Sequence, residues 1–315
     1  MGTGGSGSLG KVAVVGTGAI GGFYGGFLAR SGQEVHFLFR SDYKTVLENG
    51  LRVTIPVEPS DAFQVTPLLA YDDPHEIGIC DWVIVATKST ANPMLEKVLA
   101  PMVGLDTSML TLQNGMGNVE FLQEAFGPER TIVAGLCFTC ANRVSPGEVE
   151  NYFPGYVQFG EPGGPLSDAG QVMQKAFSDA GISCKSADRL DDALWRKLCW
   201  NVPFNGLTVA AGGITTDLIL GDAAHTRRAR SLMEEIQAAA ASYGVEIEDG
   251  FLDQQFTNTE PMGAYTPSSL IDFLADREVE VEAIWGEPLR RGRAQGINMP
   301  ELQTLYQFLL ICTSC

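Results

Sequence analysis

A glycine-rich turn between a short strand and a helix is the feature that most restricts the fold of this chain. Lys11–Val15 is an apolar run typical of a buried strand, and the segment Gly16-Thr17-Gly18-Ala19-Ile20-Gly21 follows it directly. The small apolar residues that continue to Arg30 predict a helix. A G-x-G-x-x-G segment alone is common, but the order strand, turn, helix is typical of a dinucleotide-binding domain.

Each glycine of this segment has its own role in such a domain. Gly16 allows the tight turn, Gly18 lets a pyrophosphate approach the backbone, and Gly21 lets the helix lie close to the sheet. The phosphates then meet the N–H groups of the helix N-terminus. We therefore expect a dinucleotide to contact Gly16, Thr17, Gly18, Ala19, Ile20 and Gly21.

The end of the next strand indicates which dinucleotide binds. The run 34–39 ends at Arg40, where an NAD site usually has an Asp or Glu that bonds to the ribose hydroxyls. A guanidinium at this place fits a 2′-phosphate, so the sequence favours NADPH. The alternative is an ordinary solvated arginine at a strand end.

Further strands and helices complete a first domain. Strand-like runs occur at 51–55, 62–66, 81–87, 108–112 and 183–186, with helices over 93–100 and 167–180. The run 81–87 ends at Lys88, and the run 108–112 is followed by Gln113 and Asn114. Because ligands of open parallel sheets lie beyond the carboxyl ends of the strands, we expect Lys88 and Asn114 at the ligand-binding edge.

The pattern becomes helical from residue 188 onward. Amphipathic stretches follow one another at 190–209, 223–243, 249–257, 268–277, 279–295 and 300–312. We therefore predict an α/β protein in which an N-terminal Rossmann-type doubly wound domain (11–188) is followed by an all-α C-terminal domain (189–315). The Gly- and Ser-rich residues 1–10 have the composition of a flexible leader.

One helix of the second half carries polar side chains in an apolar context. Lys197, Asn201 and Asn205 recur at steps of four, so on a helix they share one face. The positions between them are mostly apolar, which indicates a packed helix. An ammonium is costly there unless it has a partner and a function. Alternatively, Lys197 reaches water and the asparagines bond to backbone groups.

The net charge and the cysteine content indicate which partners and which cellular location to expect. A formal net charge of -17 argues against nucleic acids and anionic membrane surfaces as partners. No apolar run approaches the roughly 20 residues of a membrane helix. Seven cysteines without an export signal suggest reduced thiols and a cytoplasmic location. The pairs Cys137/Cys140 and Cys312/Cys315 are too far apart for a zinc ribbon, so we predict no metal site.

Taken together, these motifs resemble those of the ketopantoate reductase (2-dehydropantoate 2-reductase) family over nearly the whole chain. The matching segments are Gly16-Thr17-Gly18-Ala19-Ile20-Gly21, Thr87-Lys88, Gln113-Asn114-Gly115-Met116-Gly117, Trp195-Arg196-Lys197 with Asn201 and Asn205, Ser268-Ser269-Leu270, and Glu280 before Ile284-Trp285-Gly286. The resemblance implies a Rossmann domain joined to an all-helical domain. It also implies NADPH-dependent reduction of ketopantoate to pantoate, a step of pantothenate biosynthesis.

The resemblance implies roles for individual residues as well. Lys197 would be the proton donor. A carboxylate near it would hold the ammonium, and Glu280 is our candidate for that catalytic role. The implied substrate contacts are Asn114, Lys197, Asn201, Asn205 and either Ser268 or Ser269. The implied cofactor contacts beyond the glycine-rich segment are Arg40, Lys88, Asn114, Ala141 and Glu280.

Three features depart from the family pattern. Pro203 lies between the two asparagines and predicts a kink, because it removes a helix hydrogen bond. Gly206 stands where many relatives have proline. The interval 268–280 is one residue shorter than usual, and one residue on a helix is a rotation of roughly 100°, so either serine could face the substrate.

Other functions stay open at this point. A reductase or dehydrogenase of the same family could act on another branched 2-oxo or 2-hydroxy acid. A hydroxy-acid dehydrogenase of the 6-phosphogluconate type also places Lys and Asn four residues apart on a helix. A non-catalytic NADP-binding regulatory protein is the alternative from another class. The expected partner is a small 2-oxo acid, and a homodimer is retained as a hypothesis.

Overall fold

The computed structural model describes residues 7–313, which form two compact units. The first unit comprises the described residues up to Gln113 together with Asn118–Leu190. The second comprises Asn114–Gly117 and the described residues from Asp191 onward. Most of the expected leader lies outside the described residues. The assignment of Leu9 to that leader is wrong, because Leu9 is 3% exposed and belongs to the core of the first unit.

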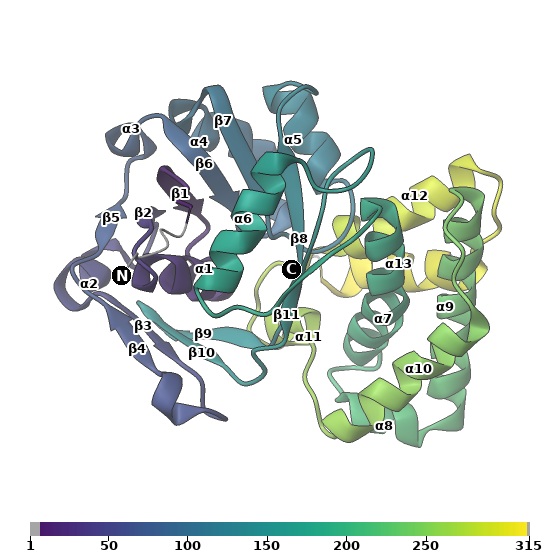
Figure 1. Cartoon of the computed structure of the whole chain (residues 1–315). Coiled ribbons are helices and arrows are strands. Elements are labelled where there is room, and N and C mark those ends of the chain that lie inside the picture. Colours follow the sequence, from purple (N-terminus) through teal and green to yellow (C-terminus); the bar gives the residue numbers. More distant parts are fainter. Residues whose placement is uncertain (1–6, 314–315) are drawn as a thin grey trace, which may run out of the picture. The chain divides into compact units, whose positions relative to one another are not determined.

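An eight-stranded sheet forms the centre of the first unit, in the order β12-β11-β8-β7-β6-β1-β2-β5 (Figure 1). Neighbouring strands are parallel except for the antiparallel pair β8 and β11. The strands are β1 (Lys11–Val15), β2 (Glu34–Leu38), β5 (Leu69–Tyr71), β6 (Cys80–Val85), β7 (Val103–Thr111), β8 (Ile132–Phe138), β11 (Tyr156–Gly160) and β12 (Cys184–Ser186). The mainly parallel sheet confirms the predicted α/β class.

A second, four-stranded sheet was not predicted. Its order is β4-β3-β10-β9. The strands are β3 (Leu51–Thr54), β4 (Phe63–Val65), β9 (Ala141–Ser145) and β10 (Glu148–Asn151). In Figure 1 this sheet lies below α1 (Ala19–Arg30), and α1 contacts strands of both sheets.

The glycines of α1 make this double contact possible. A Cβ on Gly25 would lie 2.6 Å from the Phe37 ring in the large sheet. A Cβ on Gly22 would lie 2.9 Å from Val149 in the small sheet. Larger side chains would therefore push α1 away from one sheet or the other.

Short helices complete the first unit. They are α2 (Tyr43–Asn49), α3 (Pro74–Ile77), α4 (Asn92–Leu99), α5 (Asn118–Phe126) and α6 (Asp168–Asp179), with 3-10 turns η1 (Pro59–Asp61), η2 (Ser89–Ala91) and η3 (Ala100–Met102). Ser167, where the predicted helix 167–180 begins, caps α6, because its Oγ accepts the Gly170 N–H at 3.2 Å.

Helices alone form the second unit within the described residues. They are α7 (Leu190–Ala210), α8 (Thr216–Gly221), α9 (Ala223–Ser242), α10 (Asp249–Thr259), η4 (Glu260–Met262), α11 (Ser268–Leu274), η5 (Glu282–Gly286), α12 (Glu287–Ala294) and α13 (Pro300–Cys312). Residues 201–209 of α7 are all buried, so this helix lies in the centre of the unit. The helix predicted over 279–295 is present from residue 281 to Ala294, but its first part, η5, is a π-helix.

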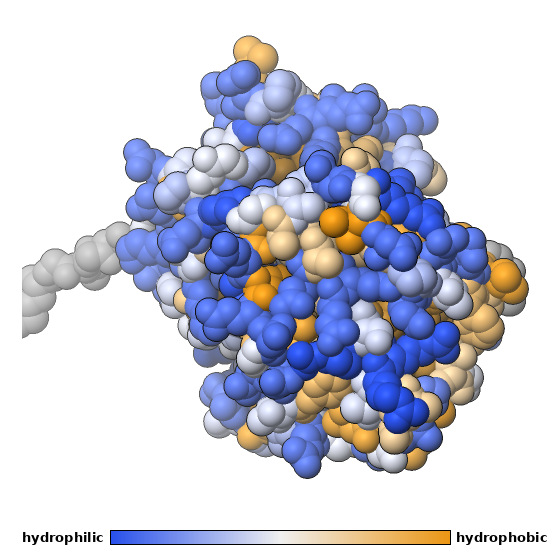
Figure 2. Space-filling view, turned by 90° about the vertical axis from the view of Figure 1, so that its right-hand side faces the viewer, coloured by the Kyte–Doolittle hydropathy of each residue, from blue (hydrophilic) through white to orange (hydrophobic). Residues whose placement is uncertain are grey.

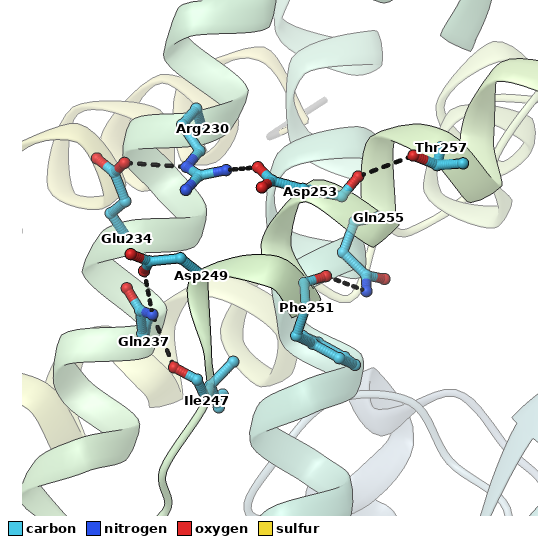
Figure 3. Close-up of polar contacts among 9 residues, drawn as sticks. All are labelled: Arg230, Glu234, Gln237, Ile247, Asp249, Phe251, Asp253, Gln255 and Thr257. Carbon is cyan, nitrogen blue, oxygen red and sulfur yellow. Dashed lines mark hydrogen bonds and ion pairs between the residues drawn. The ribbon is translucent and has the colours of Figure 1, made fainter.

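Polar contacts fasten α10 to α9 (Figure 3). Arg230 of α9 binds both Glu234, at 3.0 Å, and Asp253 of α10. Gln237 Nε2 donates to the Ile247 carbonyl at 2.7 Å and to Asp249 Oδ1 at 3.0 Å. These bonds fix the start of α10 against the outer side of α9.

The surface carries apolar side chains in small groups. Figure 2 shows them dispersed among hydrophilic residues on the face that it draws. Within residues 7–313, no helix combines the length and the apolar character that crossing a membrane requires.

Candidate active site

The glycine-rich turn brings the ends of β1 and β6 into contact. Gly16 has a φ of +94°, which favours glycine, and a Cβ there would lie 2.3 Å from the Thr87 backbone nitrogen. A Cβ on Gly21 would lie 2.4 Å from the Gly16 carbonyl oxygen. Side chains at both positions would therefore collide with backbone, which explains the two glycines without reference to a ligand.

Gly18 differs from these two glycines. A Cβ on Gly18 would meet no heavy atom within 4 Å, so packing does not require glycine there. Gly18 is also the N-cap of α1 and has no side chain to cap it. An open backbone at an uncapped helix N-terminus fits a pyrophosphate, with Ala19 and Ile20 supplying the first N–H groups.

Arg40 lies two residues beyond the end of β2, and hydrogen bonds of nearby residues stabilise the chain there. It is exposed, and Thr17 Oγ1 of the glycine-rich segment donates to the Leu38 carbonyl at the end of β2 at 2.8 Å. Both residues thus belong to the same edge of the large sheet. This arrangement leaves the Arg40 guanidinium accessible to an anionic group.

The sequence analysis missed a buried carboxylate that follows Arg40. Asp42 is 4% exposed and accepts from Arg143 Nη1 through both carboxylate oxygens, each at 2.7 Å. It also accepts from the Ser41 hydroxyl at 2.7 Å. Burial favours the neutral carboxyl, but these bonds and the Arg143 charge outweigh it and hold the pKa of Asp42 below its ordinary value. The pair ties the Arg40 turn to β9.

Other expected cofactor residues of the first unit lie near strand ends. Lys88 directly precedes η2, two residues after Ala86, whose N–H donates to the Val15 carbonyl. Ala141 is the first residue of β9 in the small sheet. Close to Lys88, Gln113 Nε2 donates to Asn92 Oδ1 at 2.8 Å and to Thr87 Oγ1 at 3.3 Å. This network holds the chain at the point where it enters the Asn114–Gly117 segment.

In the second unit, Lys197 and Asn114 are in direct contact. Lys197 Nζ donates to Asn114 Oδ1 at 3.0 Å, although the two residues are 83 positions apart. Lys197 is half-buried on α7, and Asn114 is half-buried as well. The bond to Asn114 gives the Lys197 Nζ a fixed direction, which suits a donor to a developing oxyanion.

The two asparagines of α7 are buried, and Asn205 contacts the start of α11. Asn201 is 8% exposed and Asn205 is 2% exposed. Asn205 Oδ1 accepts the backbone N–H of Ser269 at 3.0 Å, and the Ser268 hydroxyl lies 3.5 Å from the same oxygen. Ser269 is 3% exposed, whereas Ser268 is exposed. The structure thus distinguishes the two serines, and only the Ser268 side chain is open to solvent.

Glu280 is buried, unlike the acidic residues next to it in sequence. It is 8% exposed, whereas Glu278 and Glu282 are exposed. A carboxylate is rarely buried without a purpose, so Glu280 is not one more solvated acid of an acidic stretch. It lies two residues before the start of the π-helix η5.

The structure shows the surroundings of Pro203 and Gly206, two residues that depart from the family pattern. Pro203 lies inside α7, which continues as one helix to Ala210. A Cβ on Gly206 would lie 2.8 Å from Trp285 Nε1 and 2.6 Å from Leu305, so Gly206 makes room for buried side chains.

The described cysteines are free thiols that are buried or half-buried. Within residues 7–313, no cluster of three or more His, Cys, Asp or Glu could hold a metal ion. Burial raises the pKa of Cys199 to about 12 and that of Cys184 to about 11, which keeps both as thiols. Cys315, the second cysteine of the C-terminal Cys-x-x-Cys motif, lies outside the described residues.

Comparisons with known proteins agree with this organisation. The family described as "Ketopantoate reductase PanE/ApbA" matches residues 12–164, and its C-terminal counterpart matches residues 189–311. A 2-dehydropantoate 2-reductase from Nostoc sp. is 38% identical over 305 residues, which cover 95% of this chain and 94% of that protein.

Solved structures show the same fold. The crystal structure of a 2-dehydropantoate 2-reductase from Geobacter metallireducens has a TM-score of 0.90 and 39% identity, covering 95% of this chain and 98% of that one. A D-mandelate dehydrogenase solved with NADH and anilino(oxo)acetate has a TM-score of 0.84 at 22% identity, covering 96% and 98%. At that identity the second likeness is one of fold.

Proposed function

The chain belongs to the ketopantoate reductase family, and we propose that it reduces 2-dehydropantoate (ketopantoate) to pantoate with NADPH. The observation that carries the proposal is the 3.0 Å bond between Lys197 Nζ and Asn114 Oδ1. It gives the second unit an oriented ammonium beside buried amides. The predicted place in pantothenate biosynthesis, the cytoplasmic location and the homodimer belong to the same proposal.

The proposed chemistry rests on Lys197. NADPH supplies a hydride to C2 of the 2-oxo acid when it is bound. Negative charge then grows on the carbonyl oxygen, and a fixed donor must meet it. The Lys197 ammonium stabilises this oxyanion and transfers a proton to it. Asn114 keeps the ammonium in place, and the buried Glu280 is the carboxylate that we assign to balancing its charge.

Substrate selection is assigned to amide and hydroxyl groups. Asn201, Asn205 and Ser268 supply more hydrogen-bonding groups than one carboxylate and one carbonyl require. Buried polar groups reject a ligand that leaves them unpaired, so a substrate with a further hydroxyl is favoured. Ketopantoate carries that hydroxyl. We assign the substrate contact to Ser268 because Ser269 is buried and holds Asn205 through its backbone.

Cofactor binding is assigned to groups of the first unit. The open backbone at Gly18 and the N-terminus of α1 suit the pyrophosphate. The exposed Arg40 suits the 2′-phosphate that distinguishes NADPH from NADH. Lys88 and Ala141 are further proposed contacts, with Asn114 and Glu280 of the second unit.

A comparison of two substrates tests the proposal. With NADPH, we expect a higher kcat/KM for ketopantoate than for 2-oxoisovalerate, which has the branch but lacks the hydroxyl. Equal or better use of 2-oxoisovalerate would make the enzyme a general reductase of branched 2-oxo acids. Tight NADPH binding without turnover of any 2-oxo or 2-hydroxy acid would instead favour a regulatory NADP-binding protein.

A further inference from the structure

The π-helix η5 leaves one backbone carbonyl without its usual helical donor. The Glu287 N–H donates to the Glu282 carbonyl, five residues back, rather than to Ala283. The next residue, Pro288, has no N–H. The Ala283 carbonyl is therefore available to a partner outside its own helix.

That partner is the segment that carries Asn114. The Met116 N–H donates to the Ala283 carbonyl at 2.8 Å. Gly115 has a φ of +83°, and a Cβ there would lie 2.4 Å from the Ala283 oxygen, so only glycine permits this approach. Met116 is 3% exposed within the core of the second unit. The segment is thus fixed at the two residues that follow Asn114.

The same π-helix also holds α7. Trp285 is fully buried, and its Nε1–H donates to the Val202 carbonyl of α7 at 2.9 Å. Val202 lies between Lys197 and Asn205 in sequence. The missing Cβ of Gly206 leaves space for the indole. One turn of π-helix therefore contacts both chain segments whose side chains meet in the Lys197–Asn114 bond.

Surface groups hold the π-helix from its other side. Arg290 binds Glu282 at 2.6 Å and Glu287 at 3.1 Å, and the Tyr306 hydroxyl donates to Glu282. These bonds span the widened turn and stabilise it. Since a π-helix is less favourable than an α-helix, such support indicates that the turn has a function.

We propose that η5 is a positioning element that sets the distance between Lys197 and Asn114, with Trp285 and the Ala283 carbonyl as its two positioning groups. The inference rests on the proposed function, because the proton donor it positions is the one assigned there. Neither group touches substrate or cofactor in this proposal. Both act through Asn114 and α7.

Replacing Trp285 with Phe tests the indole bond. The variant Trp285→Phe keeps a buried aromatic ring, loses the donor to Val202 and leaves a small space where the larger indole packed. We expect kcat for ketopantoate to fall about tenfold while KM for NADPH stays unchanged, since the loss loosens the alignment of Lys197 rather than cofactor binding. A lost fold would lower both binding and turnover.

The matched control is Trp200→Phe. Trp200 lies on the same helix and its Nε1–H donates to Thr259 Oγ1 at 2.8 Å, away from η5. This variant loses the same kind of bond, and we expect its kcat to stay within about twofold of the unmutated protein. Equal effects of the two substitutions would overturn the proposal.

Pro288→Ala tests the bond between the Met116 N–H and the Ala283 carbonyl. This test remains valid even if Trp285→Phe fails to fold. Alanine restores an N–H that competes with Met116 near the Ala283 carbonyl, and it favours helix more than proline does. We expect lower kcat with an undiminished melting temperature, together with faster hydrogen exchange at the Met116 amide. Unchanged Met116 exchange overturns the proposal whether or not the protein reduces ketopantoate. An inactive unmutated protein with the expected exchange would overturn the proposed function alone.

Discussion

Lys197 is the residue on which the proposed chemistry depends most directly. Replacing it with Ala removes both the oxyanion partner and the proton donor, so kcat should fall by about 10² or more. NADPH affinity should persist, because the assigned phosphate contacts are residues of the first unit. Steady-state kinetics and a fluorescence titration with NADPH measure the two effects.

A conservative replacement sharpens the test of Lys197. Lys197→Arg keeps the charge, but a planar guanidinium does not fit a point-charge site and does not give up a proton, so activity should stay low. An increase in KM alone, with kcat preserved in Lys197→Ala, would reduce Lys197 to a binding residue.

Arg40 is the residue that the proposed NADPH preference requires. Loss of a charge-assisted bond to the 2′-phosphate is worth about 1.5–3 kcal/mol, or roughly ten- to hundredfold in affinity. Arg40→Ala should therefore weaken NADPH and leave NADH affinity nearly unchanged. Arg52→Ala, which removes another exposed arginine of the first unit, serves as the control. An unchanged ratio of the two affinities would refute the assignment.

At the scale of elements, the Asp42–Arg143 pair joins the start of α2 to β9. Asp42 is buried but Arg143 is about two-fifths exposed, at 39%, so we expect Asp42→Asn to lower the free energy of unfolding by only about 1–2 kcal/mol at neutral pH. Because the folded-state pKa of Asp42 lies below its ordinary value of 3.8, this stabilisation is complete above that value. It is lost as the pH falls through the folded pKa.

Urea unfolding at pH 7 and at pH 3 measures this effect. The difference between Asp42→Asn and the unmutated protein should be largest at pH 7 and should shrink at pH 3. Asp106→Asn is the control, because it removes an exposed carboxylate of the same unit. A difference that is the same at both pH values would contradict the assigned role of the Asp42 charge.

Elements with a strong local pattern were predictable from the sequence. The strand, glycine turn and helix at 11–30 are determined by residues close together in sequence. Gly16 and Gly21 are needed there because any side chain at either position would collide with the backbone. Lys197, Asn201 and Asn205 recur at steps of four, which likewise predicts a helix. The structure confirms that helix as α7.

Elements that depend on distant partners were not predictable. The stretch 279–295 has the composition of one helix, and its π-turn becomes favourable only through bonds to Met116 and Val202, far away in sequence. The pairing of β9 and β10 with β3 into a second sheet is equally non-local. Glu280 lies in an acidic stretch, so only tertiary packing distinguishes it from its exposed neighbours. The roles of the site residues themselves stay predictions.

At the scale of the whole molecule, one segment that is continuous in sequence with the first unit belongs in space to the second unit. Asn114–Gly117 follows a strand of the first unit but groups with the helices of the second. The proposed proton donor and the residue that orients it therefore belong to one compact unit. Unfolding of the second unit alone should abolish this arrangement, even where the glycine-rich turn of the first unit persists.

The strong negative charge of the chain predicts how salt affects cofactor association. A net charge of -17 repels anionic NADPH over distances of roughly 30 Å at 0.01 M salt but only about 8 Å at 0.15 M. The proposed attraction by Arg40 and Lys88 acts at contact distance, where screening is weaker. Long-range repulsion should therefore be screened first, and the association rate of NADPH should rise about two- to fivefold over this range.

Stopped-flow fluorescence at increasing potassium chloride measures this rate. NADH is the matched ligand, because it lacks the 2′-phosphate and should show a smaller increase. A steady decrease of the NADPH rate with salt would mean that local cations dominate the approach of the cofactor as well as its binding. In that case the attraction at the glycine-rich edge would outweigh the charge of the molecule as a whole.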